Sequence, residues 1–384
     1  MRRLLWLASA MIFFDVAFFA AIAPLLPDYV DELGLSKAEA GVLSASYAAG
    51  TLLASLPAGF VASRVGPRRS VICGLLLLGV SSLVFGLVEE IGLLDAARFT
   101  QGIAGALIWA GALTWLITAS PEENRGRVIG AALGTAVAGA LLGPVIGAVA
   151  ASVGTSLVFG SVLVVSLALA FAASRLPEVR APERQNLGEV VATLFSKPIF
   201  NGVVFVAVPS VMFGAIEVLV PLRIDSLGGG HAVIAAGFIG GAALEATLAP
   251  QAGRLSDRIG RRTPYVIGLT ICAVAMVAVA LAQTLGAVLA ALIVTSLGAG
   301  LCFAPALTLL SDIAESTNLH QGFAAGLSNM AWASGQVVGG VGGGVVASRT
   351  GYAAPSIAIA ILLLVTVAYA FRALAPAPTR PAES

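Results

Sequence analysis

Charged side chains are scarce in this chain. Asp, Glu, Lys and Arg make up 11% of its 384 residues, whereas soluble globular domains carry roughly 25%. Hydrophobic residues make up 58%, and a soluble fold of this length could not bury that much apolar surface. We therefore expect a lipid bilayer to surround most of the chain. The 21 basic and 20 acidic residues nearly cancel, which argues against nucleic acid as a partner.

Residues that many enzymes and metal proteins require are also few. Neither of the two lysines belongs to a G-x-x-x-x-G-K-[ST] motif, so no P-loop for ATP hydrolysis is present. The two histidines form no H-E-x-x-H pair, and no G-x-S-x-G motif occurs. The cysteines lie singly in apolar runs, without the spacing of disulfide frameworks or metal sites: Cys73, Cys272 and Cys302. The sequence predicts no metal, no cofactor and no enzymatic activity.

Long apolar runs are abundant instead. A membrane-spanning helix needs about 20 mostly apolar residues. Twelve segments qualify: 4–26, 39–62, 70–88, 91–118, 127–151, 154–176, 199–222, 232–254, 264–284, 287–311, 322–348 and 354–375. The first resembles a signal peptide, but too few apolar residues precede its Ala8-Ser9-Ala10 site, so we expect it to be retained.

The basic residues of the connections predict the orientation. With the N-terminus in the cytoplasm, 17 of them lie on the cytoplasmic side. Three lie outside, Lys37, Arg223 and Arg349, and Arg98 lies within a span. This bias follows the positive-inside rule. It predicts a multi-pass protein of the cell membrane with both termini cytoplasmic.

Two sequence patterns occur twice at a separation of about half the chain. Gly143-x-x-x-Gly147 recurs as Gly339-x-x-x-Gly343. A basic loop also recurs, and its two copies contain Gly59, Ser63, Arg64, Gly66, Arg68 and Arg69, then Gly253, Asp257, Arg258, Gly260, Arg261 and Arg262. We infer two duplicated six-helix bundles, residues 1–176 and 199–375. A linker, 177–198, is predicted to contain a short amphipathic helix, and 376–384 to be a disordered tail.

The motifs resemble those of the major facilitator superfamily over essentially the full length. The loop from Gly59 to Arg69 is similar to the family pattern G-x-L-a-D-r-x-G-r-r, and Arg98 to Gly102 to R-x-x-q-G. The fifth span resembles the glycine-rich signature of drug:proton antiporters at Gly134, Gly139, Gly143, Pro144 and Gly147. The resemblance implies two six-helix bundles around a central cavity that opens alternately at each face.

One position departs from the family pattern. The acid of the first basic loop is replaced by Ser63, whereas the second loop keeps Asp257. In the family this acid docks on a helix N-terminus of the opposite half, where a carboxylate is favoured, and locks the inner gate. We expect Asp257 to contact the start of the fifth span and Ser63 to form a neutral hydrogen bond at most. The outward-open state is then less firmly latched.

The glycines of the fifth and eleventh spans have two interpretations. Gly130 and the signature glycines recur every four or five residues, a spacing that lets helices approach closely. Tight packing alone explains this spacing. The resemblance implies in addition that this face, with Pro144, bends and slides as the halves rock.

Asp15 is the leading candidate for a functional residue. It lies in the middle of the first span, where an Asp costs about 2.5–3.5 kcal/mol on insertion scales. Phe18 and Phe19 lie one turn away on the same helix face. Apolar surroundings disfavour the charged form of a carboxyl group. We therefore predict that Asp15 binds and releases a proton.

Further polar and aromatic residues lie within spans. Glu245 is central in the eighth span, and Glu217 lies in the outer third of the seventh. Arg98 could pair with Asp95 three residues earlier or, as the resemblance implies, take part in proton transfer. Glu217 could instead reach the outer water, and the aromatic residues could serve packing. The other candidates for lining the cavity are Asn329, Trp109, Trp115 and Trp332.

These observations predict a monomeric secondary transporter. Buried acids and aromatic neighbours favour a small amphipathic or cationic compound, and the resemblance of the fifth span to antiporters implies its proton-coupled export. The alternative is a facilitator or symporter of a neutral metabolite such as a sugar. Receptors and scaffolds are disfavoured because they do not require duplicated halves with buried acids.

Overall fold

The computed structural model describes residues 2–121, 125–179, 193, 196–317 and 321–374, and this part of the chain is almost entirely helical. Its helices are α1 (Arg2–Ala20), α2 (Ile22–Leu33), α3 (Lys37–Val65), α4 (Pro67–Leu87), α5 (Ile91–Ala119), α6 (Arg125–Val153), α7 (Thr155–Ser174), α9 (Lys197–Ser226), α10 (His231–Ile259), α11 (Arg262–Leu281), α12 (Leu285–Ser316), α13 (Gln321–Thr350) and α14 (Ala353–Ala373). The all-α prediction is confirmed.

The helices follow the predicted spans closely. For example, the predicted 91–118 is observed as Ile91–Ala119. Eleven spans in the described residues are long and apolar enough to cross a membrane, with α1 and α2 counted as one. The twelfth, α13, has 30 residues but is rich in glycine, and polar amides such as Asn329 and Gln336 lower its hydropathy. Its polar composition suits a helix that packs between others.

The first span differs from the prediction of a single helix over 4–26. A break at Ala21 divides it into α1 and α2, and α2 continues to Leu33. Pro24 explains the break, because proline has no N–H to donate to the carbonyl of Ala20 and its ring crowds that carbonyl. Gly34 ends α2 with φ +65°.

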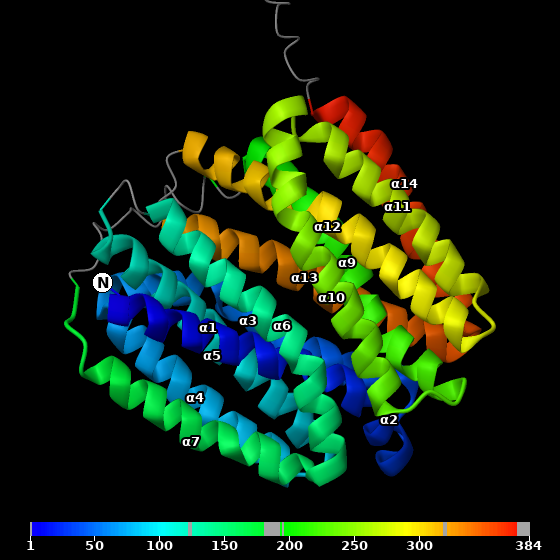
Figure 1. The fold of residues 1–384 in the computed structure, drawn as a ribbon, viewed down its shortest axis with the longest axis horizontal. Helices are drawn as coiled ribbons and strands as arrows, with labels where there is room; N and C mark the ends of the chain where they lie inside the picture. Colours follow the sequence, from blue (N-terminus) through cyan, green and yellow to red (C-terminus); the bar gives the residue numbers. More distant parts are fainter. Residues whose placement is uncertain (1, 122–124, 180–192, 194–195, 318–320, 375–384) are drawn as a thin grey trace, which may run out of the picture.

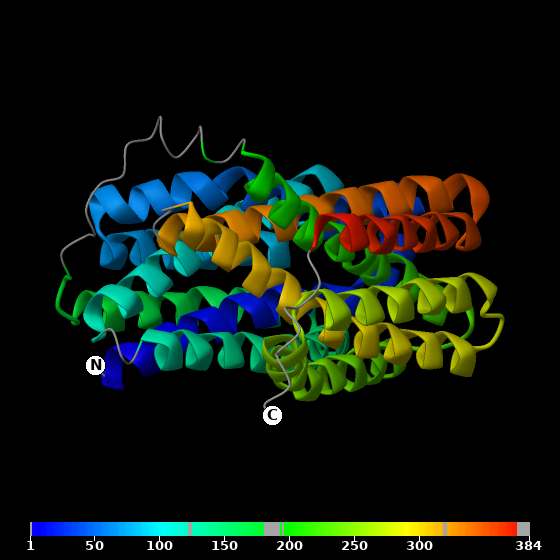
Figure 2. The same ribbon diagram turned by 90° about the horizontal axis from the view of Figure 1, so that it is seen from above.

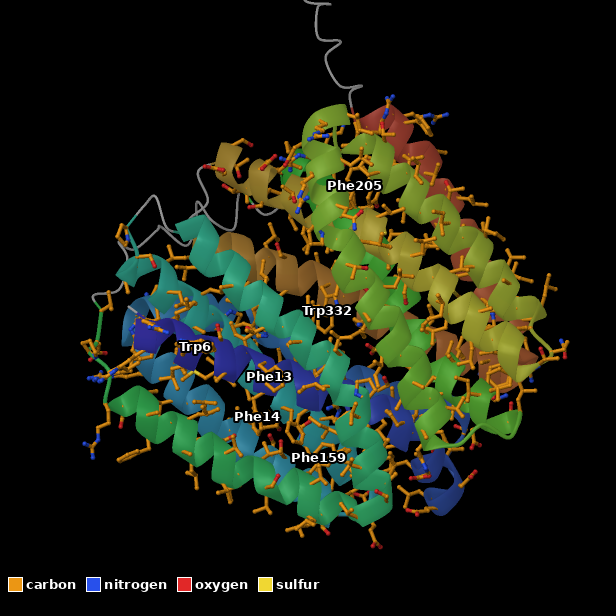
Figure 3. All side chains as sticks on the ribbon, viewed as in Figure 1. Trp6, Phe13, Phe14, Phe159, Phe205 and Trp332 are labelled. Atoms are coloured by element: carbon orange, nitrogen blue, oxygen red, sulfur yellow. The ribbon has the colours of Figure 1, made fainter. Side chains whose placement is uncertain are left out.

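The long helices form two six-helix bundles, α1–α7 (the N-bundle) and α9–α14 (the C-bundle) (Figures 1 and 2). Each bundle has its own buried apolar core. Figure 3 shows Phe159 within the N-bundle and Phe205 within the C-bundle, whereas Trp332 lies where the two bundles meet. The core of the N-bundle also takes in Val218 and Leu222 of α9, so apolar packing joins the bundles there.

The bundles converge at one face and diverge at the other. We call the face that holds Arg2 and Ala373 the terminal face, and the face that holds Gly34 and Gly228 the opposite face. In Figure 1 the N-bundle helices run from the left edge and α10, α11 and α14 of the C-bundle run from the top, and both sets converge at the lower right near α2.

The two basic loops are tight turns at the terminal face. Gly66 joins α3 to α4 with φ +99°, and Gly260 joins α10 to α11 with φ +84°. Residues with a Cβ rarely adopt such angles, which explains why both copies of the motif contain glycine here. Most of the predicted amphipathic linker helix, 180–192 and 194–195, and the tail from 375 lie outside the described residues.

Candidate functional site

Asp15 lies at the centre of the N-bundle and is 1% exposed. The hydroxyl of Tyr47 in α3 donates to both carboxylate oxygens, at 2.9 and 3.0 Å. The indole N–H of Trp109 in α5 donates to Oδ2 at 3.1 Å. Two neutral donors therefore hold the carboxylate of Asp15 inside the bundle. Trp109, one of the predicted cavity residues, is thus in direct contact with Asp15.

Gly105 provides the space for this arrangement. A Cβ at Gly105 would clash with the hydroxyl of Tyr47 and lie 2.9 Å from Oδ1 of Asp15. Gly102, one turn earlier, lets α5 approach the backbone of Tyr47. The glycine of the R-x-x-q-G motif thus brings α5 close enough to α3 for the site to form.

Arg98 is the buried cation of the site, with 0% exposure. Its guanidinium donates to Oε1 of Gln101 at 3.0 Å and to the carbonyl of Phe19 at 3.3 Å, and it makes a long contact of 3.5 Å to the carbonyl of Phe18. Gln101 in turn donates to Ser82 at 3.0 Å. The fork of Arg98 thus binds α1 just before its break.

The ion pair considered between Asp95 and Arg98 is not formed. Asp95 accepts a hydrogen bond from Ser46 at 3.4 Å instead, and Arg98 points into the bundle. The Nε of Arg98 is buried without a hydrogen-bond partner in the described part of the chain.

Arg98 lies within electrostatic reach of two acids from different bundles. These are Asp15 of α1 and Glu217 of α9. Glu217 lies beside Gln336 of α13, which is 3% exposed. Among the described residues, neither acid forms a direct ion pair with Arg98. One guanidinium thus faces two carboxyl groups without neutralising either by contact.

An aromatic cluster joins the site to the C-bundle. The ring of Phe19 lies 4.8 Å from that of Tyr47 and 5.4 Å from that of Trp332 in α13. Figure 3 shows Trp332 between the two bundles. The guanidinium of Arg98 lies 5.2 Å from the centre of the Tyr47 ring. Trp332, Phe19 and Tyr47 therefore form an aromatic wall beside Asp15 and Arg98.

Three other predicted residues lie outside this site. Glu245 is half-buried in α10 and packs near Gly300 of α12. Asn329 is half-buried in α13. Trp115 is 1% exposed in the core of the N-bundle, so packing accounts for it.

Contacts between the bundles close the opposite face. Asp28 of α2 and His231 of α10 lie 2.6 Å apart. The ammonium of Lys37 lies 4.2 Å from the ring centre of Tyr352, which directly precedes α14. A Cβ at Gly344 of α13 would clash with the backbone of α3. The backbones of α3 and α13 are therefore in close contact toward this face.

Comparisons with known proteins agree with this architecture. The family model described as Major Facilitator Superfamily matches residues 5–244 and 225–384. This chain belongs to the Major Facilitator Superfamily. It is 26% identical over 265 residues to the "Uncharacterized MFS-type transporter YcaD" of Escherichia coli O139:H28 (strain E24377A / ETEC), 68% of each chain. The protein of that name from Shigella flexneri is 26% identical over the same lengths.

Two solved structures show the major facilitator fold. A bacterial homolog of the human lysosomal transporter Spinster, in an inward-facing and unoccupied conformation, superposes with a TM-score of 0.77 at 14% identity, covering 96% of both chains. A D-xylose-proton symporter superposes with a TM-score of 0.76 at 16% identity, also covering 96% of both. The chain is thus a multi-pass membrane transporter of a small molecule, and the family assignment supports a protein that is not an enzyme.

The family's basic loops differ between the bundles. Ser63 donates to the carbonyl of Phe60 at 2.8 Å, within its own helix. Asp257 is exposed, and its carboxylate has no partner among the described residues. The predicted contact with the start of α6 adjoins residues 122–124, and these lie outside the described residues.

The family's glycine signature packs α6 against the first span. A Cβ at Gly139 would lie 2.5 Å from the carbonyl of Phe13, and one at Gly143 would lie 2.6 Å from that of Ala17. Gly147 packs against Ala21, at the break between α1 and α2. Gly134 has no such neighbour. The stripe therefore permits a close contact at the break, in agreement with the tight-packing interpretation.

Sequence reasoning missed three members of the site: Tyr47, Phe19 as part of the wall, and Gln336. Tyrosine hydroxyls and amides inside spans need hydrogen-bond partners. This requirement could have identified Tyr47 and Gln336, although neither is charged. Gln101 was noted only as part of its motif, although its amide fixes Arg98.

Proposed function

We propose that this chain exports a small amphipathic or cationic compound in exchange for protons. The observation that carries this proposal is the carboxyl group of Asp15, buried between helices and held by the neutral donors of Tyr47 and Trp109. A buried carboxylate is costly unless a cation or a proton neutralises it. A proton and a cationic compound therefore compete for Asp15, and this competition couples their opposite movements.

The aromatic wall supports the proposed class of compound. Phe19, Tyr47 and Trp332 present ring faces next to the acid, and such faces attract organic cations and stack on flat rings. Glu217 adds a second carboxyl group from the C-bundle within reach of Arg98. A cation with an apolar body would contact both bundles at once.

A second candidate function is proton symport of a neutral metabolite. The position of Arg98 favours it, because the guanidinium offsets the charge of one acid before any substrate arrives. The structural neighbour described as a D-xylose-proton symporter has the same fold. The direction of substrate movement under a pH gradient separates the two candidates.

The bundles supply the movement. We propose residues 1–176 and 199–375 as two units that rock about the central site in a monomer. With the terminal face in the cytoplasm of a cell-membrane protein, the closed contacts between Asp28 and His231 and between Lys37 and Tyr352 lie outside. The conformation is then inward-facing, and the divergence of the bundles at the terminal face supports this assignment.

Transport by purified protein in liposomes tests the proposal. Vesicles with an acidic interior are given labelled amphipathic cations and, separately, neutral sugars. An antiporter accumulates the cation as protons leave, and dissipating the gradient abolishes the uptake. A symporter accumulates its substrate only in vesicles with an alkaline interior. Gradient-independent equilibration of every compound would contradict both mechanisms.

A further inference from the structure

The first basic loop holds an anion from its own chain. Arg68, at the start of α4, donates to Glu178 at 3.1 Å and to the carbonyl of Leu176 at 3.0 Å. Arg69 lies 3.7 Å from the same carboxylate. A Cβ at Gly66 would lie 2.8 Å from Glu178, so the carboxylate rests against the glycine turn. We call this arrangement the filled cradle.

The second basic loop repeats the cradle without the acid. Arg262, the counterpart of Arg68, donates to the carbonyl of Leu374 at 3.4 Å, and Leu374 follows the last helix as Leu176 follows α7. The sequence after Leu374 contains no acid before Glu383. Among the described residues, Arg262 has no ion pair. We call this copy the open cradle.

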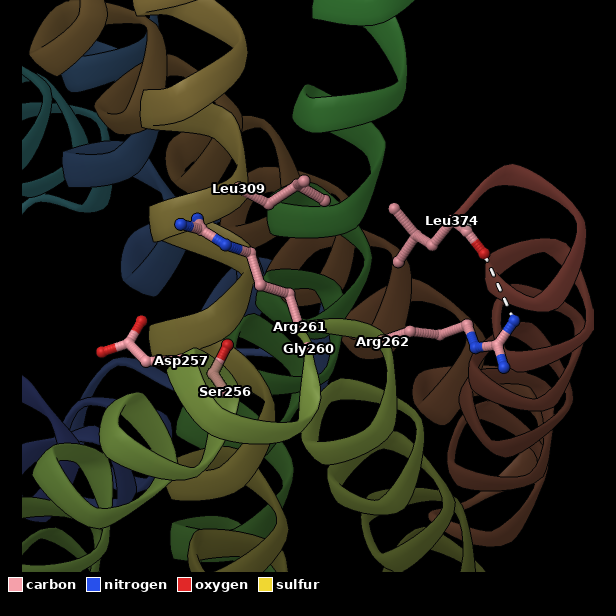
Figure 4. A pocket seen from close by; sticks show the side chains of 7 residues that line it. All are labelled: Ser256, Asp257, Gly260, Arg261, Arg262, Leu309 and Leu374. Atoms are coloured by element: carbon pink, nitrogen blue, oxygen red, sulfur yellow. Dashed lines mark hydrogen bonds between the residues drawn. The ribbon is translucent and has the colours of Figure 1, made fainter. Parts of the chain in front are cut away.

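A cavity of about 440 Å³ occupies the open cradle. Figure 4 shows its lining: Ser256, Asp257, Gly260, Arg261, Arg262, Leu309 and Leu374. Arg262 lies on the side of Gly260 that faces Leu374, and Asp257 lies on the other side (Figure 4). The acid of the loop is therefore turned away from Arg262.

Two further features favour an anion in this cavity. Arg261 forms an ion pair with Asp312, but its Nη1 is buried without a hydrogen-bond partner among the described residues. The helix α11 begins at Arg262 without a side-chain cap, and the free N–H groups of a helix N-terminus attract anions. Asp312 offsets the charge of Arg261, whereas Arg262 has no ion pair among the described residues.

We propose that the open cradle binds a phosphate group. Arg262 presents a planar fork that matches phosphate oxygens, and the volume exceeds what one carboxylate requires. The ring of Phe371 lies 5.2 Å from the guanidinium of Arg262 and is 56% exposed, and Ile259 beside the loop is 41% exposed. This apolar border places the cradle at the bilayer surface. A phospholipid headgroup and a soluble phosphate share the chemistry that it recognises.

Thermal unfolding of the purified full-length protein in detergent tests this site without any transport substrate. Three probes are compared at constant ionic strength: inorganic phosphate, short-chain phosphatidylglycerol and short-chain phosphatidylcholine. Binding to the folded protein raises the unfolding midpoint with probe concentration. A rise with phosphatidylglycerol alone identifies a lipid site, and a rise with inorganic phosphate as well identifies a general phosphate site.

Matched variants locate the binding. Arg262→Gln should weaken the apparent affinity by about tenfold, since it removes a charged donor. Arg258→Gln removes the same charge from an exposed residue of the same loop and should leave the affinity within about twofold. Glu178→Ala empties the filled cradle and should create a second phosphate site.

Other results overturn the proposal. It fails if no probe raises the midpoint, or if Arg262→Gln and Arg258→Gln weaken binding equally. It also fails if phosphate binds only after Glu383→Gln, because Glu383 of the chain itself would then be the occupant.

Discussion

The buried acids of the two bundles have different surroundings. In the N-bundle, Asp15 accepts hydrogen bonds from two helices, and Arg98 is fixed next to it by Gln101 and by backbone carbonyls. In the C-bundle, Glu245 lies beside α12 without a polar partner among the described residues. The two bundles are duplicates, but only the N-bundle holds its acid in a preorganised site. The acid of the C-bundle is isolated.

This contrast shows what duplication preserves. Features that shape the backbone are repeated, namely the positive-φ glycines Gly66 and Gly260 and the glycine stripes of α6 and α13. Two features that carry charge are not repeated: the acid of the basic loop remains only as Asp257, and Arg98 has no counterpart within a C-bundle span. The repeated glycines serve movement in both bundles, whereas the polar site belongs mainly to the N-bundle.

Neutralising Asp15 tests the contrast most severely. Asp15→Asn mimics the protonated acid permanently, so accumulation driven by a pH gradient should disappear while downhill substrate movement continues. Asp15→Glu should retain partial coupling. Glu245→Gln, at the isolated acid, should leave coupling nearly unchanged in the same liposome assay. If Asp15→Asn pumps as well as the original protein, Asp15 is not the coupling site, and Glu245 becomes the candidate to test in the same assay.

Arg98→Lys keeps the positive charge and removes the planar guanidinium group. An ammonium group cannot bind Gln101 and the carbonyls of α1 in the geometry of a guanidinium. We expect transport to fall about tenfold or more and the protein to lose roughly 1–3 kcal/mol, the usual cost of leaving buried polar groups unpaired. Initial rates and thermal unfolding measure both effects. Arg223→Lys at the opposite face is the control, and an equal loss there would contradict a specific role for Arg98.

Gly105→Ala introduces a methyl group where Tyr47 and Asp15 meet. The Cβ would lie 2.9 Å from Oδ1 of Asp15 and closer to the Tyr47 hydroxyl, so one hydrogen bond must lengthen. Overpacking of this kind costs about 1–3 kcal/mol, and coupling should weaken without vanishing. Gly134→Ala, where a Cβ meets nothing within 4 Å, is the matched control. Equal effects of the two variants on the unfolding temperature would show that the space at Gly105 is not required.

The sequence predicted the helices of this molecule better than its candidate functional site. Apolar length determines where a helix crosses, so the spans agreed with the observed helices, including Ile91–Ala119. The break at Ala21 was missed because Pro24 and Pro27 lie within an otherwise continuous apolar run. Asp15 and Trp109 were singled out separately, but nothing in their spacing shows that they touch. Tyr47 and Gln336 enter the site through the approach of other helices, which one sequence does not reveal.

The contact between Asp28 and His231 joins α2 to α10 at the closed opposite face. The two side chains lie 2.6 Å apart, so removing the imidazole removes one contact that the outward-open form must break. His231→Ala should therefore increase the outward-open fraction modestly. Distances between spin labels on α2 and α10 measure the change. An unchanged distance distribution in His231→Ala would show that this contact does not hold the face closed.

The smallest expected effect concerns the basic loops. Asp257 is exposed here, and exposed charges contribute little to stability, so Asp257→Asn should change the free energy of this conformation little. If the acid docks on α6 once the terminal face closes, the same change removes a contact of the closed form alone, and the population shifts toward the inward-open form. Ser63→Ala removes a hydrogen bond within α3 and should shift it less. Distances between labels on α3 and α10 at the terminal face report both populations. Equal and negligible shifts in the two variants would mean that neither loop latches the closed form.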